Sequence, residues 1–450
     1  MAASLRSFLE QLKRQNSLYL VKKPVNPRFE LGALLKKTKG TVPMFFQKIE
    51  GYDVPAVGGI VGTRENFALA LGIDKSELLV KITEAITNPG ETRLLPSGPV
   101  QENVLTKGFD IGKLFPIPTF HEKDSGAFIT AGIVVAKDPL YGRRFTSIRR
   151  MQLNGPSNLS ILIESPGLIE QYYEFERRGQ AMEVAIVLGV HPAITLSSQL
   201  STQTFGLDKY NVASRLMGEP LPLVKCKTID LEVPADAEIV LEGRMLPHVR
   251  HPEGPFGELM GYYGPQTMQP VVEVSAVTFR NNPIFQIIFP SSYEHKLPNA
   301  LMREVVLYNH VRHVVPTVQD VHLTMAGGGR CHAIISIKKT AEGQGKQAIL
   351  AALASNKDVK HVVVVNDDVD IFNPEDVEWA IATRVQADQD VIIIPGAQGT
   401  PLEPSHNLRG VSAKMGIDAT YPLAEKERFA RTRIPGYDQI RLEDYLTLEW

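Results

Sequence analysis

Between residues 125 and 295, short β-rich runs alternate with turn residues, and this pattern narrows the possible folds more than any other feature of the chain. Gly, Pro, Asn and Asp separate the runs, and these residues favour tight turns. The runs cover 129–137, 144–153, 183–190, 230–246, 271–280 and 284–289. Many closely spaced strands favour a sandwich or a partly open barrel. Helical patterns near 166–178 and 207–217 interrupt the series.

The segments on either side have a different character. Apolar residues recur at helical spacing over 4–15, and further helices are expected at 64–72 and 75–87. Prolines and glycines make 88–120 loop-like. After a helix over 299–313, strands and helices alternate, which predicts a small α/β layer. The predicted division is an N-terminal α+β domain over 1–115, a central β domain over 116–310 and a C-terminal α/β domain over 311–450.

The charge balance excludes a general attraction to nucleic acid or to anionic membranes. The chain has 48 Lys and Arg against 50 Asp and Glu, a net charge of −2, and a basic surface would require a clear excess of cations. The two cysteines match no zinc or disulfide pattern. No apolar run approaches the roughly 18 residues of a membrane span. We therefore expect a cytoplasmic enzyme of several domains, in which a basic pocket remains possible.

The segment PEGPFGE carries two glutamates, Glu253 and Glu258, five residues apart across a Gly- and Pro-rich turn. Such a turn can bring both carboxylates to one cleft, where mutual repulsion and burial raise one pKa, as a general acid requires. The alternative is a surface loop with two solvated glutamates.

Further basic residues belong to segments that could hold an anion. In the strand RRFTSIRRMQ, alternation places Arg150 on the face opposite Arg149, so one arginine can point inward towards an anion; solvated charges on an edge strand are the alternative. His295 and Arg303 lie at the entry to a helix. They could bind an anion there, or they could only cap the helix and occupy its surface. Arg330 follows a glycine run that could approach a ligand or serve as a flexible connection.

Several segments together resemble the UbiD family of reversible decarboxylases that use prenylated FMN. The segments are RRMQ (149–152), LVKCKTIDLEVPADAEIVLEG (223–243), PEGPFGE (252–258), ATR (382–384) and SAKMGIDAT (412–420). The resemblance covers nearly the whole chain in order. It implies a central split β-barrel of the flavin-reductase type, a C-terminal α/β domain and a tail that self-associates into a homo-oligomer, a dimer or a hexamer.

The resemblance also implies roles for individual residues. Glu253 would hold Arg150 beside the flavin, and Glu258 would donate the proton, while prenylated FMN acts as a covalent electron sink as CO2 leaves. The cofactor would be supplied by a flavin prenyltransferase. Its expected contacts are Ile148, Arg149, Arg150, Leu162, Ile163, Glu164, Gly167, Leu168 and Lys414.

The usual metal ligands of the family, an Asn, a His and a Glu, are missing at the matching positions. Those positions are Phe145, Pro166 and Lys209. We therefore expect that the usual metal site at the flavin phosphate is lost or rebuilt, and hypothesise that the Lys209 ammonium replaces the cation there.

The resemblance also suggests a substrate. YEHKLPNALMR is similar to the furan-2,5-dicarboxylate decarboxylase branch, so His295, Arg303 and Arg330 are expected to bind a second carboxylate of a heteroaromatic substrate. A hydroxybenzoate or a pyrrole carboxylate is the alternative within this class. From a different class, an FMN-binding oxidoreductase, a cofactor chaperone or an inactive paralogue remains possible.

Overall fold

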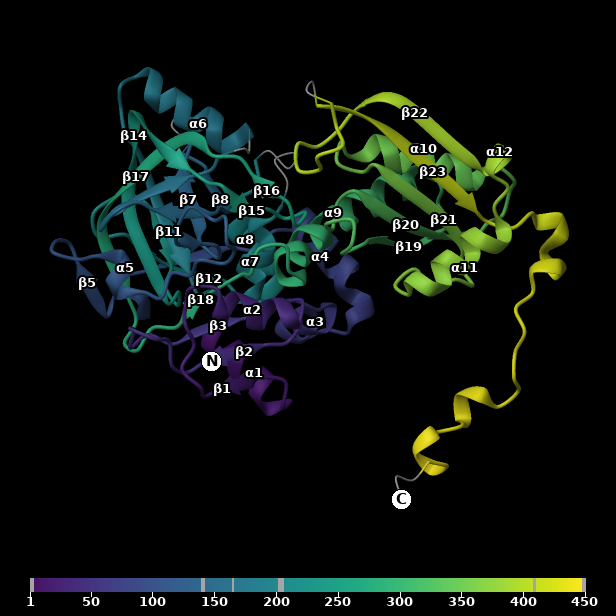
Figure 1. The fold of residues 1–450 in the computed structure, drawn as a ribbon, viewed down its shortest axis with the longest axis horizontal. Coiled ribbons are helices and arrows are strands. Elements are labelled where there is room, and N and C mark those ends of the chain that lie inside the picture. The colour runs from purple at the N-terminus through teal and green to yellow at the C-terminus, as the bar shows by residue number, and fades with distance from the viewer. Residues whose placement is uncertain (1–3, 139–141, 164–165, 201–205, 408–409, 447–450) are drawn as a thin grey trace.

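The computed structural model describes residues 4–138, 142–163, 166–200, 206–407 and 410–446. N-terminal, central and C-terminal regions follow one another along the chain and end in an extended tail (Figure 1). The predicted multidomain α+β fold is confirmed, with a curled half-barrel sheet in the middle.

The N-terminal region packs helices against a small sheet of order β1-β2-β3-β18. The strands are β1 (Tyr19–Val21), β2 (Met44–Phe46), β3 (Ala56–Gly58) and β18 (Phe285–Gln286). The helices are α1 (Leu5–Arg14), α2 (Glu30–Lys37), α3 (Arg64–Leu71), the 3-10 turn η1 (Lys75–Glu77) and α4 (Leu78–Thr87). Helix α1 confirms the predicted amphipathic pattern, because its leucines and Phe8 face the core. The sheet was not predicted, because its strands are too short to show a period.

The central region is built on a sheet of order β6-β9-β10-β17-β14-β11-β7-β8, with β5 added beside β17. Its strands are β5 (Asn103–Leu105), β6 (Phe128–Ile129), β7 (Ile133–Lys137), β8 (Arg144–Ile148), β9 (Met151–Leu153), β10 (Asn158–Ile161), β11 (Met182–Leu188), β14 (Ile239–Glu253) and β17 (Thr267–Phe279). The long pair β14 and β17 contains register shifts, which bend strands and increase their twist. The sheet therefore curls around an apolar core.

Shorter elements surround this sheet. They are β4 (Thr92–Leu95), η2 (Pro99–Gln101), α5 (Ile111–Leu114), α6 (Pro166–Arg177), α7 (Pro192–Ser198), α8 (Lys209–Met217), β12 (Leu221–Lys225), β13 (Glu232–Pro234), β15 (Phe256–Gly257) and β16 (Tyr263–Gly264). The stretch 88–120, expected to be loop-like, contains short strands and turns of helix. These elements are three or four residues long, and their partners lie far away in sequence, so local composition could not reveal them.

The C-terminal region is an α/β layer with sheet order β19-β20-β21-β23-β22. Its elements are α9 (Tyr293–Val314), β19 (Val318–Leu323), β20 (His332–Ile337), α10 (Gln344–Ser355), β21 (His361–Asn366), α11 (Pro374–Arg384), α12 (Ala387–Asp390), β22 (Val391–Gln398) and β23 (Val411–Ala419). Helix α9 starts earlier than expected, because the Ser292 hydroxyl accepts the His295 N–H and caps it there. The predicted boundary at residue 310 falls inside this helix.

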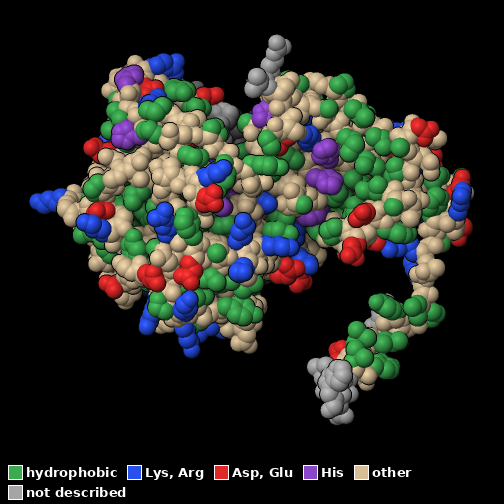
Figure 2. Space-filling view, viewed as in Figure 1, with side chains coloured by type: hydrophobic (Ala, Val, Ile, Leu, Met, Phe, Trp, Pro, Cys, Tyr) green, Lys and Arg blue, Asp and Glu red, His purple; other side chains and the backbone are tan. Residues whose placement is uncertain are grey.

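The chain ends in a tail that extends away from the body (Figures 1 and 2). It contains the 3-10 turns η3 (Leu423–Phe429), η4 (Tyr437–Gln439) and η5 (Leu442–Asp444). Its large exposed apolar side chains are Ile434, Tyr437, Ile440, Leu442, Tyr445 and Leu446. Over the body, by contrast, Figure 2 shows Lys and Arg interspersed with Asp and Glu. In the part of the chain that the structure describes, no helix is both long and apolar enough to cross a membrane.

Candidate active site

A cavity of about 600 Å³ lies between the curled central sheet, helix α9 and loops of the C-terminal region. Part of its wall combines cations with apolar side chains. These are Arg149, Arg150 and Lys209 together with Ile148, Leu162 and Leu200. A cavity of this volume, with an apolar lining and a few converging charges, is typical of a site for a cofactor-sized ligand.

Arg150 joins two carboxylates at one point of this cavity. Its Nε and Nη2 donate to the two oxygens of Glu253 at 2.7 and 2.9 Å, and its Nη1 donates to Glu258. The guanidinium also lies over the ring of Phe256, 4.8 Å from the centroid. The bidentate pair and the ring leave Arg150 little rotational freedom.

The two glutamates reach Arg150 because of the turn between them. Glu253 is the last residue of β14 and is fully buried, so it is not a solvated loop carboxylate. Glu258 directly follows β15 and lines the cavity. Both Arg149 and Arg150 also line it, although strict alternation would place only one inward. They fall between β8 and β9, where regular strand geometry is interrupted.

Lys209 is the first residue of α8 and is held deep in the wall. Its Nζ donates to the carbonyls of Thr146 at 2.7 Å and Ser198 at 3.0 Å, and lies 5.2 Å from the Phe145 ring centroid. Burial, and then the nearby Arg149 charge, lower the pKa of Lys209 to about 7. A buried cation next to another cation favours binding of an anion, and a flavin phosphate has the charge to fit.

The other residues expected near a flavin occupy different places. Ile163 and Leu168 are buried in the apolar core of the central region, and Gly167 is in the first turn of α6. Glu164 lies outside the described residues. Lys414 donates through Nζ to the carbonyls of Leu353 at 3.0 Å and Asn356 at 3.3 Å, and Asn356 lines the cavity.

His295, Arg303 and Arg330 all line the same cavity. Arg303 donates from Nε to Asn299 at 2.7 Å and pairs with Asp358 at 3.0 Å. Arg330 pairs with the same Asp358 oxygen at 3.5 Å. Burial, then Arg330, Lys296 and Arg150, lower the pKa of His295 to about 3, so the imidazole is neutral.

Two further acidic residues of this cavity were not predicted from the sequence. Glu294 is fully buried and accepts N–H groups of residues 59–61, and burial raises its pKa to about 7. Asp358 follows α10 in the segment NKDVK, which carries no recognisable motif. Their positions depend on contacts between distant parts of the chain, so no local signal could have identified them.

The three positions where the family has metal ligands are occupied here by Phe145, Pro166 and Lys209. The Phe145 ring faces the Lys209 ammonium, and Pro166 begins α6. Within the described ranges, no three or more His, Cys, Asp or Glu side chains gather as a metal would require. The replacement of the metal by Lys209 stays a prediction.

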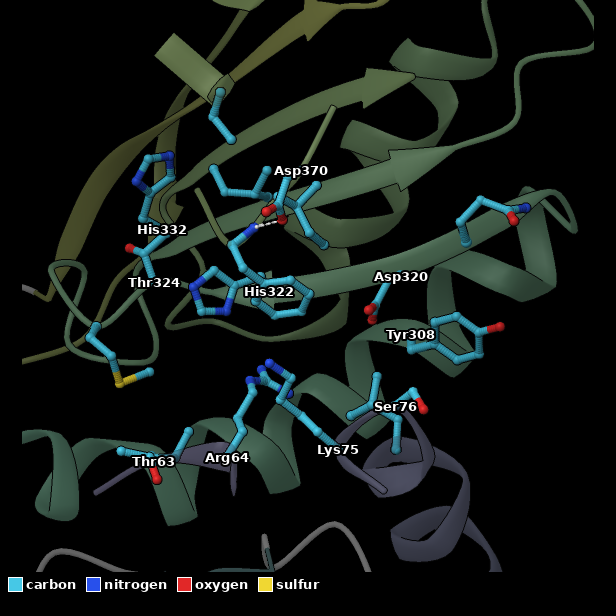
Figure 3. A pocket seen from close by; sticks show the side chains of 18 of the residues that line it. Thr63, Arg64, Lys75, Ser76, Tyr308, Asp320, His322, Thr324, His332 and Asp370 are labelled. Carbon is cyan, nitrogen blue, oxygen red and sulfur yellow. Dashed lines mark hydrogen bonds between the residues drawn. The ribbon is translucent and has the colours of Figure 1, made fainter. Parts of the chain in front are cut away.

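A second cavity, of about 1300 Å³, lies between the N-terminal helices and the C-terminal sheet. Figure 3 shows Arg64 and Lys75 on one side of it, facing His322 and Asp320 on the other. Arg64 pairs with Glu304 of α9, whose carboxylate also accepts the Leu323 N–H at 2.8 Å. These contacts hold α9 against both the N-terminal region and the C-terminal sheet. The second cavity is therefore lined by a residue, Arg64, that helps to position the helix carrying His295 and Arg303.

Comparison with known proteins identifies the family. Models of the 3-octaprenyl-4-hydroxybenzoate carboxy-lyase match in chain order: the N-terminal domain over residues 9–86, the Rift-related domain over 93–293 and the C-terminal domain over 297–419. An anhydromevalonate phosphate decarboxylase of Methanothermobacter thermautotrophicus is 37% identical over 427 residues, covering 95% of this chain and 99% of the relative.

Solved structures agree with this assignment. The UbiD-class enzyme HmfF from Pelotomaculum thermopropionicum in complex with FMN superposes with a TM-score of 0.96 at 49% identity, covering 98% of this chain and 100% of that one. An evolved dimeric form of HmfF in complex with prFMN gives 0.92 at 46% identity, covering 99% and 100%. This chain belongs to the UbiD family of carboxy-lyases.

Proposed function

We propose that this carboxy-lyase uses prenylated FMN to decarboxylate a heteroaromatic dicarboxylate, with furan-2,5-dicarboxylate as the favoured substrate and 2-furoate as the product. The observation that carries the proposal is that Arg150, Arg303 and Arg330 line the same cavity. A small substrate with an anion at each end can place one anion at Arg150 and the other at the Arg303–Arg330 pair.

The chain's own residues supply positioning and a proton. When bound, prenylated FMN supplies an electron sink for the pair of electrons that CO2 leaves behind. Glu253 fixes Arg150, which holds the carboxylate that will leave. Arg303 and Arg330 hold the remaining carboxylate. Glu258 delivers a proton to the ring carbon, so that the carbon–carbon bond to CO2 is replaced by a carbon–hydrogen bond.

The cofactor residues have the character that a flavin requires. Arg149, Arg150 and Lys209 face the cavity beside Ile148 and apolar neighbours, which suits a phosphate next to an apolar ring system. The HmfF structures contain FMN and prFMN, at 49% and 46% identity to this chain. A flavin prenyltransferase is the partner that would supply the cofactor.

Co-expression with a flavin prenyltransferase followed by an assay of CO2 release tests this proposal. Furan-2,5-dicarboxylate should be turned over and 4-hydroxybenzoate should not, and protein loaded with ordinary FMN should be inactive. Turnover of 4-hydroxybenzoate alone would overturn the substrate assignment. Flavin reduction by a nicotinamide cofactor, without CO2 release, would instead favour an oxidoreductase.

A phosphate-bearing acid is the second candidate substrate. The relative that is 37% identical is named for anhydromevalonate phosphate, and the Arg303–Arg330 pair could face a phosphate as well as a carboxylate. Anhydromevalonate phosphate therefore belongs in the same assay.

The low pKa of Lys209 predicts that binding of a phosphate takes up a proton. With a pKa of about 7, the Lys209 amine is largely neutral at pH 8.5 and largely charged at pH 6. A phosphate beside it restores the ammonium and raises the pKa. FMN binding to cofactor-free protein should therefore take up nearly one proton at pH 8.5, measured by calorimetry in buffers of different ionisation enthalpy. At pH 6 the ammonium is already present and the phosphate, whose second pKa is about 6, should instead release part of a proton.

Two controls isolate the phosphate and the lysine. Riboflavin, which has no phosphate, should bind without this uptake, and Lys209→Met should abolish it for FMN. Equal uptake with riboflavin and FMN would show that Lys209 does not face the phosphate.

We also propose that the tail mediates self-association into a homo-oligomer. Three of its apolar side chains, Ile434, Leu442 and Leu446, are each more than three-fifths exposed, and such a concentration of apolar surface usually marks an interface. Replacing Leu442 and Leu446 by Asp should lower the molar mass measured by light scattering to that of a smaller species. Met268→Asp, at an exposed position of the central sheet, is the matched control. An unchanged mass for the tail variant would exclude this role.

A further inference from the structure

Asp358 places a negative charge between the two arginines proposed to bind the second anion of the substrate. One of its oxygens, Oδ2, lies 3.0 Å from Nη1 of Arg303 and 3.5 Å from Nη1 of Arg330. Its backbone N–H donates to the Asn356 side chain at 2.9 Å, which fixes the turn after α10. Asp358 is 4% exposed and lines the cavity together with both arginines.

The hydrogen bonds of this cluster are incomplete. Oδ1 of Asp358 and Nε of Arg330 are buried, and neither has a hydrogen-bond partner among the described residues. Buried polar atoms of this kind are costly unless a ligand or water satisfies them. Arg303 is anchored further, because its partner Asn299 bonds Gln199 at 3.4 Å. The unpaired donor of the two arginines is therefore Nε of Arg330, which lines the cavity.

The cluster of His295, Arg303, Arg330 and Asp358 carries a single net positive charge. Burial and the neighbouring Arg303 lower the pKa of Arg330 only to about 10, so it stays protonated, and His295 is neutral. Lys357 also lines the cavity, but it is exposed and screened by water. One positive charge balances one carboxylate, whereas a phosphate dianion would leave one buried charge uncompensated.

We propose that Asp358 is a specificity-determining residue: it neutralises one of the two arginines, so the site accepts a second group with one negative charge and rejects a phosphate dianion. The inference rests on the proposed function, because it assumes that Arg303 and Arg330 face the end of the substrate opposite the leaving carboxylate. It separates the two candidate substrates by charge rather than by size.

Isosteric ligands test this charge selection in the unaltered protein. The ligands are 2-furoates that carry sulfonate or phosphonate at ring position 5, assayed at pH 8 as inhibitors of the flavin-loaded protein. Both groups are tetrahedral, but the sulfonate has one negative charge and the phosphonate two. The sulfonate should bind at least about tenfold more tightly, since an unpaired buried charge costs this much or more. Equal binding, or a preference for the phosphonate, would overturn the inference.

Asp358→Asn removes the charge at nearly constant shape and should shift this preference at least about tenfold towards the phosphonate. The matched control is Asp376→Asn, which removes one charge from an ion pair with Arg431 away from this cavity and should keep the wild-type ratio. An unchanged ratio in Asp358→Asn refutes the role of Asp358. If neither ligand binds better than unsubstituted 2-furoate, the anion subsite of the proposed function fails as well.

Discussion

Replacing Glu258 by Gln is expected to lower turnover by about 100-fold to 10,000-fold, the range typical of a lost general acid. Glu258 lines the cavity and shares the guanidinium of Arg150 with Glu253, so it reaches the place proposed for the leaving carboxylate. Glutamine keeps the size and can still hydrogen-bond, but it has no proton to deliver. The measurement is kcat for CO2 release, with the flavin content of each preparation determined from its absorbance.

The control for this variant is Glu273→Gln, at an exposed position of β17 in the same sheet, which should leave kcat unchanged. The flavin content of Glu258→Gln should match that of the wild type, because the residues expected to bind the flavin phosphate are cations such as Lys209, and Glu258 is not one of them. A variant that keeps kcat within a few fold of the wild type would show that another group donates the proton.

Arg303→Ala is expected to lower kcat/KM for a dicarboxylate by at least about 30-fold, equivalent to ~2 kcal/mol, while a 2-furoate with an uncharged group at ring position 5 loses far less. The loss has two causes. The substrate loses a charge-assisted partner, and Asp358, which Arg303 pairs with at 3.0 Å, is left to repel the second carboxylate. The measurement is kcat/KM for both substrates with the same enzyme preparation.

Arg312→Ala provides the matched control, since Arg312 is on the same helix but lines the other cavity. It should leave both values unchanged. Equal losses for the dicarboxylate and the monocarboxylate in Arg303→Ala would mean that Arg303 supports the fold or the cofactor and does not select the substrate.

The sequence predicted the parts of the fold that have a long local period. Helix α1 and the α/β alternation after residue 318 repeat over many residues, so their hydrophobic patterns can be recognised. The strands of the N-terminal sheet are too short for a pattern, and β18 joins that sheet from the far end of the central region. Strand β23 was missed because Lys414 and Gly416 interrupt its apolar pattern.

The site was harder to predict than the fold, because its residues come from distant parts of the chain. The turn PEGPFGE indicated that two glutamates could meet, but their partner Arg150 precedes Glu253 by 103 residues. Only the family resemblance connected them before the structure did. Neither the sequence motifs nor the family resemblance indicated Asp358, because it belongs to no motif. Its proposed role depends on two arginines that α9 and the turn before β20 bring next to it.

The most direct test of the central claim is a turnover of furan-2,5-dicarboxylate in D2O by protein co-expressed with a flavin prenyltransferase, followed by NMR of the product. Decarboxylation in which a solvent-exchangeable proton replaces CO2, as proton transfer from Glu258 requires, predicts one CO2 per 2-furoate and a single deuterium at ring position 5. Protein loaded with ordinary FMN should give no product. Recovery of unchanged furan-2,5-dicarboxylate from prenylated-FMN-loaded protein that does decarboxylate another acid would contradict the account.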